Sequence, residues 1–115
     1  QMADEVKAFA ASLSAKTGLD VKIDLVSSYP AQAFHEDWKG AVARAAQQLG
    51  YSNMRVVSGA GHDAVYMAKL APTGMIFIPC LNGISHNEIE SATTEHITAG
   101  CNVLLHAMLE RARVA

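Results

Sequence analysis

The chain has 115 residues, enough for one domain of modest size, and half of them are hydrophobic while 17% are charged. This composition is typical of a globular protein and excludes an intrinsically disordered one. The formal net charge is −2, and the scattered Lys and Arg residues form no basic patch of the kind that binds nucleic acid. No apolar run approaches the roughly 18 residues of a membrane helix, and the amino end lacks a signal-peptide pattern. We therefore expect no nucleic-acid or membrane partner and a cytoplasmic location.

The first thirty residues predict one helix followed by one strand. Residues 3–17 carry apolar side chains at helical spacing, and Gly18 follows as a natural terminator. Residues 21–25 alternate strictly between apolar and polar, which is typical of a strand with one buried face. Pro30 then interrupts the pattern, because proline cannot donate to a sheet ladder. We place a domain boundary here, between residues 1–28 and 29–115, and one helix with one strand is too small to be stable alone.

The remainder of the chain predicts an alternation of helices and strands, hence an α/β fold. The expected elements are a helix from residue 36 that stops at Gly50, a strand at 54–57, a short helix at 62–70, a strand at 74–80, and a helix from Thr93 or Thr94 to about Arg113. The 74–80 run is apolar without alternation, as expected for a strand with helices on both faces. The last helix should pack through a stripe made of Ile97, Cys101, Leu104, Leu105 and Met108. Cys80 and Cys101 have neither metal-ligand nor redox spacing, so we predict a buried thiol for each.

Two histidine loops are the candidate site. One has the sequence Ser-Gly-Ala-Gly-His-Asp-Ala and contains Gly61 and His62, and the other contains His86 after the 74–80 strand. Loops at the ends of neighbouring strands collect catalytic groups, and neutral imidazole is a good zinc ligand. Glycine beside His62 lets backbone amides approach a substrate carboxylate or oxyanion. Asp63 either orients His62 or caps the next helix, and Glu88 and Glu90 are either solvated charges or supports for His86.

The joint pattern of residues 58–64, 72–80 and 82–88 resembles the carboxyl-terminal third of the N-carbamoyl-L-amino-acid hydrolases. Allantoate amidohydrolases and β-ureidopropionases are similar, and all belong to the zinc aminoacylase and carboxypeptidase superfamily. The resemblance implies a two-domain metallohydrolase, with an α/β/α catalytic domain and an inserted α+β lid that also dimerises. Residues 1–28 look like the last helix and strand of that lid, and residues 29–115 like the return of the chain into the catalytic domain.

The resemblance also implies roles for individual residues. His86 matches a metal ligand, and Gly61 and His62 match positions that contact substrate. The complete enzyme would hold two divalent metal ions (zinc, manganese, cobalt or nickel), which lower the pKa of a bridging water and polarise the attacked carbonyl. The other ligands and the glutamate general base are expected upstream, so this chain holds no catalytic residue of its own. Because one histidine cannot hold zinc tightly, we predict that the chain alone is inactive and binds no stoichiometric metal.

The function implied is that of a fragment of an amidohydrolase. The complete protein would cleave the C–N bond of N-carbamoyl-L-amino acids or related ureido acids with metal-activated water, as a homodimer joined through the lid. The alternatives are an allantoate amidohydrolase, or a non-catalytic binding or assembly module that reuses the fold. The sequence leaves open the substrate, the metal, and whether the chain is a natural piece or a shortened product.

Overall fold

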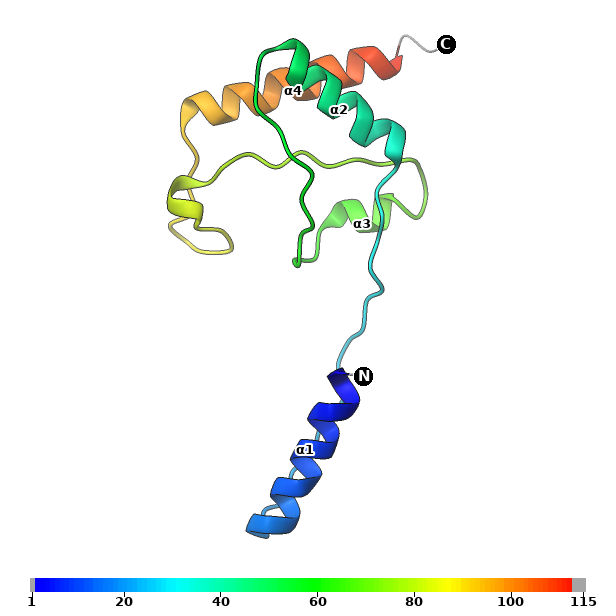
Figure 1. The fold of residues 1–115 in the computed structure, drawn as a ribbon, viewed down its shortest axis with the longest axis vertical. Helices are drawn as coiled ribbons and strands as arrows, with labels where there is room; N and C mark the ends of the chain where they lie inside the picture. The colour runs from blue at the N-terminus through cyan, green and yellow to red at the C-terminus, as the bar shows by residue number, and fades with distance from the viewer. Residues whose placement is uncertain (1, 113–115) are drawn as a thin grey trace. The chain divides into compact units, whose positions relative to one another are not determined.

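The computed structural model describes residues 2–112 of the chain. It contains the α-helices α1 (Met2–Thr17), α2 (Glu36–Gln48), α3 (Asp63–Met67) and α4 (Thr94–Ala112), and the short 3-10 helix η1 (Leu81–Gly83) (Figure 1). The chain divides into two compact units, Gln1–Ala31 and Gln32–Ala115, and each is described by itself. The four α-helices confirm the helical segments predicted from the sequence.

The helices end where the sequence places capping and turn residues. Gly18 has a φ of 72° and Gly50 a φ of 75°, and this left-handed conformation stops α1 and α2. The hydroxyl of Thr93 accepts a hydrogen bond from the amide of His96 at 3.3 Å, so Thr93 is the residue that caps α4. α4 runs to Ala112, and the predicted end at Arg113 lies outside the described residues.

The predicted strands are wrong for the described part of the chain. Residues 21–25, 54–57 and 74–80 have no regular secondary structure, and residues 2–112 contain no β-strand. A strand must pair its backbone groups with a neighbouring strand, and the backbone of residues 75–79 makes no hydrogen bond with any described residue. The side chain of Val57 is fully exposed. The α/β sheet expected from the sequence is therefore replaced by helices joined through irregular segments.

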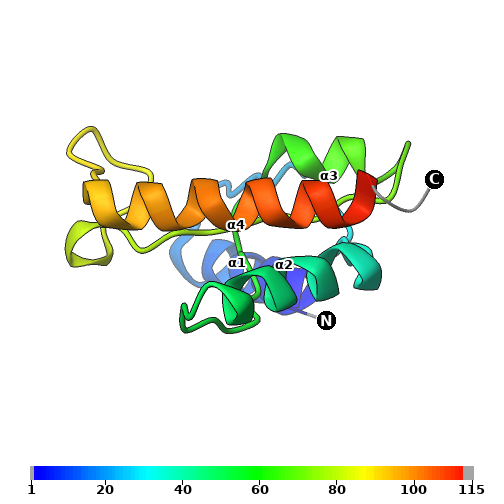
Figure 2. The ribbon, with the colours of Figure 1, turned by 90° about the horizontal axis from the view of Figure 1, so that it is seen from above.

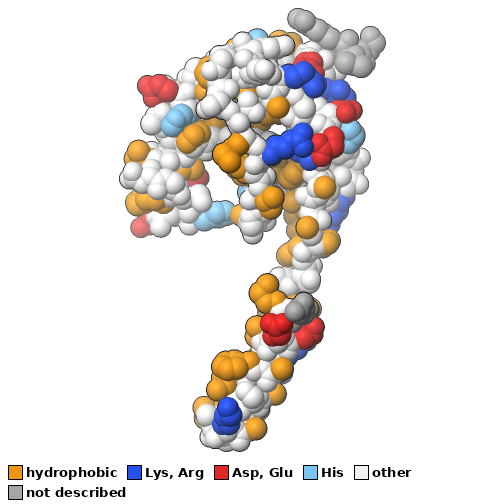
Figure 3. All heavy atoms as spheres, viewed as in Figure 1, with side chains coloured by type: hydrophobic (Ala, Val, Ile, Leu, Met, Phe, Trp, Pro, Cys, Tyr) orange, Lys and Arg blue, Asp and Glu red, His pale blue; other side chains and the backbone are white. Residues whose placement is uncertain are grey.

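The first unit consists of α1 and the irregular segment that follows it. The amide of Gly18 donates to the carbonyl of Ser14 at 2.9 Å and closes the last turn. The helix buries no side chain, and its apolar residues Val6, Phe9 and Leu13 are all exposed. Figure 3 shows hydrophobic side chains along the helix surface. The apolar face predicted for this helix is present but stays exposed among the described residues of its unit.

The second unit is built on the packing of α2 against α4. Its buried residues lie at helical spacing on the facing sides of the two helices and are Ala41, Ala45, Ala46, Val103 and Ala107. Alanine side chains at these positions let the two helix backbones approach closely, and Figure 2 shows the helices side by side. Val42, Leu49 and Ile76 pack around this small core.

The face of α4 that packs differs from the prediction. Ile97, Leu104, Leu105 and Met108 are between 48% and 55% exposed, whereas Val103 and Ala107 are buried against α2. The prediction is wrong because α4 is apolar over a broad arc, and the alanine-rich side of α2 accommodates the smaller residues of that arc. The prediction of buried thiols is also wrong, since Cys101 is exposed and Cys80 is half-buried.

The irregular segment 72–80 is held close to both helices. A Cβ atom at Gly74 would lie 3.0 Å from Cβ of Trp38 in α2, and one at Gly100 of α4 would lie 2.6 Å from Cγ2 of Ile78. The amide of His35, just before α2, donates to the carbonyl of Thr73 at 3.0 Å. Because Gly100 has no side chain, the segment can lie against α4, and it leads directly into η1 and the His86 loop.

The ion pair between Arg44 of α2 and Glu110 of α4 gives a pH-dependent contribution to stability. Arg44 Nη2 lies 2.5 Å from Glu110 Oε1, and this hydrogen bond holds the pKa of the Glu110 carboxyl below its ordinary value of 4.5. Because the pKa of Glu110 is lower in the folded state than in the unfolded state, the ion pair contributes fully to stability when the pH is above the unfolded-state pKa. This contribution is lost as the pH falls through the folded-state pKa. We expect Glu110→Gln to lower the urea midpoint at pH 7 and to differ less from the wild type at acidic pH, below the ordinary carboxyl pKa, measured by the fluorescence of Trp38. An equal deficit at both pH values would contradict this expectation.

Candidate functional site

His62 is held in place by two neighbours in the second unit. Its Nε2 atom lies 2.7 Å from the hydroxyl oxygen of Ser58, and its ring meets Phe77 edge-on at a centroid distance of 5.4 Å. The side chain is half-buried, and its Nδ1 edge has no partner among residues 2–112. Gly61, which precedes it, is exposed. The imidazole is therefore fixed at one edge while its other edge remains available to a ligand.

Asp63 has neither of the two roles considered for it. His62 occupies the N-cap position of α3 and makes no side-chain cap hydrogen bond, while Asp63 is the first residue of the helix. The cap prediction is wrong because the helix begins one residue earlier than a cap at Asp63 would require. Ser58, rather than Asp63, orients His62, and no spacing pattern in the glycine-rich loop predicts that contact.

The His86 loop follows η1 and is closed by backbone hydrogen bonds. The amide of Leu81 donates to the carbonyl of Ser91 at 2.7 Å, which brings the two ends of the loop together. His86 has a φ of 53°, in the left-handed region that few residues other than glycine adopt. Its imidazole is exposed and makes no hydrogen bond with a described residue. The loop thus presents an unpaired imidazole from a defined backbone position.

Glu90 is exposed and supports this loop through its carboxylate. Its Oε2 atom accepts a hydrogen bond from the amide of His86 at 2.7 Å, and its Oε1 atom accepts one from the thiol of Cys80 at 3.7 Å. Partial burial raises the pKa of the Cys80 thiol, and the adjacent Glu90 carboxylate raises it further, so the thiol remains a neutral donor at pH 7. Glu88 is exposed and makes no contact of this kind within residues 2–112. Of the two acidic residues, Glu90 is a support and Glu88 is a solvated charge.

The described residues supply one candidate ligand of a metal site. An exposed, unpaired imidazole on a closed loop is a suitable ligand for a divalent metal ion. Within residues 2–112, however, no group of three or more His, Cys, Asp or Glu side chains lies close enough to hold such an ion. Tight sites take three or four protein ligands. His86 is thus the residue of this chain that would hold a metal, together with ligands from outside it.

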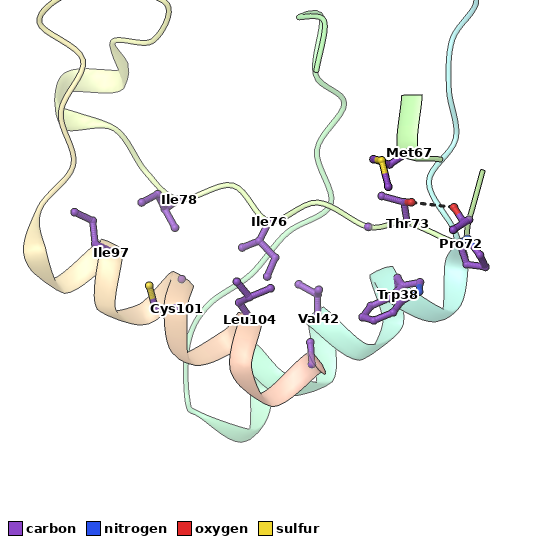
Figure 4. Close-up of a pocket in the computed structure, with 14 residues that line it drawn as sticks. Trp38, Val42, Met67, Pro72, Thr73, Ile76, Ile78, Ile97, Cys101 and Leu104 are labelled. Atoms are coloured by element: carbon purple, nitrogen blue, oxygen red, sulfur yellow. Dashed lines mark hydrogen bonds between the residues drawn. The ribbon is translucent and has the colours of Figure 1, made fainter. Parts of the chain in front are cut away.

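An apolar groove of about 650 Å³ lies between segment 72–80 and the helices of the second unit (Figure 4). Ile97, Cys101 and Leu104 of α4 face it, with Ile78 opposite. Its polar side chains are few, and the Thr73 hydroxyl already donates to the carbonyl of Ala71 at 2.9 Å. Substrate pockets contain a few polar groups that orient the ligand. Neither His62 nor His86 lines this groove. We therefore assign the groove to packing rather than to chemistry.

The chain belongs to peptidase family M20/M25/M40, whose model matches residues 2–110. Within the family it is similar to the N-carbamoyl-L-amino-acid amidohydrolase of Rhizobium meliloti, with 42% identity over 113 residues that cover 98% of this chain and 27% of that protein. The allantoate amidohydrolase of Escherichia coli K12 is 51% identical over 58 residues, which cover 50% of this chain and 14% of that protein. These relatives confirm the resemblance noted in the loop sequences.

The backbone of the chain is also similar to that of a solved structure. An amidase of the hydantoinase/carbamoylase family from Burkholderia vietnamiensis matches with a TM-score of 0.88 and 50% identity, covering 96% of this chain and 27% of that one. The chain thus spans about a quarter of the length of the proteins that it matches.

Proposed function

We propose that this chain is the carboxyl-terminal part of a dinuclear-metal amidohydrolase that cleaves the C–N bond of N-carbamoyl-L-amino acids or related ureido acids. The observation that carries the proposal is its similarity to the Rhizobium meliloti N-carbamoyl-L-amino-acid amidohydrolase over 98% of its length. His86 supplies an imidazole that can bind a metal ion. His62 supplies an imidazole that is held at one edge and can contact substrate with the other edge.

The roles proposed for these residues follow from their surroundings. His86 would contribute one ligand to a metal site completed by side chains outside this chain. The bound ions would lower the pKa of a water molecule and polarise the carbonyl that it attacks. His62, held by Ser58 and Phe77, directs its Nδ1 edge toward a substrate carboxylate or developing oxyanion. Gly61 has no side chain, so a substrate can approach its backbone closely.

Three features support the proposal that the chain works within a larger protein. It spans 27% of its amidohydrolase relative, the backbone of residues 75–79 is unpaired among the described residues, and the apolar faces of α1 and α4 are exposed. Covering these surfaces would complete a core that the present residues leave open. Assigning residues 1–28 to a dimerising lid, and choosing zinc, manganese, cobalt or nickel, belong to the same proposal.

Allantoate is the second candidate substrate. The 51% identity to the allantoate amidohydrolase of Escherichia coli over 58 residues favours it. Both substrates carry a ureido group and a carboxylate, so His62 and Gly61 would have the same roles with either. The described helices include none that is both long and apolar enough to cross a membrane, and a cytoplasmic location stays a prediction.

A hybrid enzyme tests the proposal. The 113 matching residues of the Rhizobium meliloti enzyme are replaced by this chain, and turnover is measured with N-carbamoyl-L-amino acids and, in parallel, with allantoate. We expect a kcat/KM within about tenfold of the parent, because tenfold corresponds to only a small change in barrier height. A folded hybrid with no turnover would favour the non-catalytic module.

The isolated 115-residue chain is assayed in the same way as the hybrid. It is expected to show no turnover and no stoichiometric metal, since it supplies one metal ligand. Turnover together with one bound metal per chain would show that the chain is a complete enzyme, contrary to the proposal.

A further inference from the structure

The backbone of His86 requires stabilisation. A non-glycine residue in the left-handed region is disfavoured roughly tenfold or more relative to right-handed conformations. Within residues 2–112, only Asn82 and His86 adopt it without being glycine. Asparagine and histidine enter this region more often than other non-glycine residues, but it remains disfavoured for both, and His86 lies in an exposed loop. A hydrogen bond to the His86 backbone would therefore stabilise this conformation.

Glu90 makes that contact. Its carboxylate accepts the His86 amide at 2.7 Å, a charge-assisted hydrogen bond to the backbone of the residue whose conformation is disfavoured. Glu90 is itself fixed by the turn before it, because its amide donates to the carbonyl of Asn87 at 2.9 Å, and the Asn87 side chain accepts the amide of Ile89 at 3.1 Å. The contact between Glu90 and Cys80 ties the loop to the end of segment 72–80.

The direction of the His86 side chain depends on this hydrogen bond. Rotation of His86 to a negative φ would move its Cα–Cβ bond relative to the loop and carry the imidazole away from its present position. Glu90 is thus placed to position His86, with one oxygen on the His86 amide and the other on the Cys80 thiol.

We propose that Glu90 is a positioning residue that fixes the direction of the His86 imidazole by holding the His86 amide in the left-handed conformation. The inference rests on the proposed role of His86 as a metal ligand. Outer-shell partners that orient a metal-bound histidine typically change metal affinity by about 10- to 100-fold when they are removed. Here the partner acts on the backbone of the histidine rather than on its ring.

The test uses three variants of the hybrid enzyme. Glu90→Ala should weaken metal binding about 10- to 100-fold in chelator competition and lower kcat with little change in KM, because Gly61 and His62 are unaltered. Glu90→Gln keeps an oxygen that accepts the His86 amide and should restore affinity to within a few-fold of the unsubstituted hybrid. Glu88→Ala removes an equally exposed carboxylate of the same loop and should change neither quantity. If Glu90→Gln is as damaging as Glu90→Ala, Glu90 acts by its charge and the positioning role is wrong.

A second measurement separates this inference from the proposed function. In the 115-residue chain, hydrogen exchange of the His86 amide should be about tenfold faster in Glu90→Ala than in the wild type, as expected for loss of one hydrogen bond to a charged acceptor. This result needs no metal and no turnover. Equal exchange rates would overturn the positioning role even if the hybrid is active, and an inactive hybrid would count against the proposed function alone.

Discussion

Replacing His86 by alanine in the hybrid enzyme is expected to abolish high-affinity binding at one of the two metal positions and to lower kcat by more than 100-fold. Loss of an outer-shell partner typically costs about 10- to 100-fold in metal affinity or activity, and loss of a direct ligand should exceed that range. The imidazole of His86 has no hydrogen-bond or ion-pair partner among the described residues, so its removal breaks no such interaction. Metal content is measured by elemental analysis after dialysis, and kcat with N-carbamoyl-L-amino acids.

His106→Ala is the matched control for this substitution. His106 is exposed on α4 and its side chain makes no hydrogen bond or ion pair with a described residue, so the variant should keep both metal ions and full turnover. Equal folding of the two variants is checked by circular dichroism. If His86→Ala retained both ions and the kcat of the unsubstituted hybrid, His86 would not be a metal ligand.

Replacing Ala45 by leucine is expected to destabilise the second unit by about 1–3 kcal/mol, the usual cost of overpacking. Ala45 is 1% exposed and lies in the cluster formed with Val103 and Ala107. The larger side chain cannot be accommodated unless α2 and α4 move apart. The measurement is urea unfolding of the 115-residue chain followed by Trp38, the single tryptophan, which lies on α2.

Two further variants show whether crowding is the cause. Ala8→Leu makes the same change at an exposed position of α1 and should leave the unfolding midpoint of the second unit unchanged. Val103→Ala, added to Ala45→Leu, frees space in the same cluster and should recover part of the loss, because residues in one cluster couple. A midpoint for Ala45→Leu equal to that of the wild type would mean that the helices do not pack tightly in solution.

The helices could be predicted because their signals are local. The apolar spacing of α1, the glycines that end α1 and α2, and the threonine that caps α4 all act within one or two turns of the backbone. The face of α4 that packs could not be predicted in this way. It depends on the alanines of α2, which are more than fifty residues earlier in the chain.

The strand predictions were wrong because strand formation depends on contacts that are not local. The apolar character of residues 74–80 and the alternation of residues 21–25 describe what a strand would bury, but a strand forms only with a partner. The described residues offer no partner, so these segments remain irregular. Local preference is insufficient when the pairing that it needs is non-local.

The candidate site was predictable in its residues but not in its contacts. The loop sequences single out Gly61, His62 and His86 through their resemblance to a family that the comparison confirms, while the roles of these residues stay predictions. The hydrogen bond between Ser58 and His62 and the one from the His86 amide to Glu90 depend on the path of irregular loops, which residue spacing does not determine. Residue spacing therefore does not single out Ser58, and it leaves Glu90 open between a solvated charge and a support for His86.

The backbone of residues 75–79, which pairs with no described residue, has a practical consequence for handling the chain. A short apolar run whose amides and carbonyls pair with no residue of 2–112 is a template for edge-to-edge association between copies, and this association increases with concentration. The apolar run lies between Gly74 and Pro79, and proline cannot donate a hydrogen bond to a β-ladder. The segment that could pair between copies is therefore limited to residues 75–78. Dilute samples, or fusion to a polypeptide that covers this stretch, are the conditions in which the isolated chain should stay dispersed.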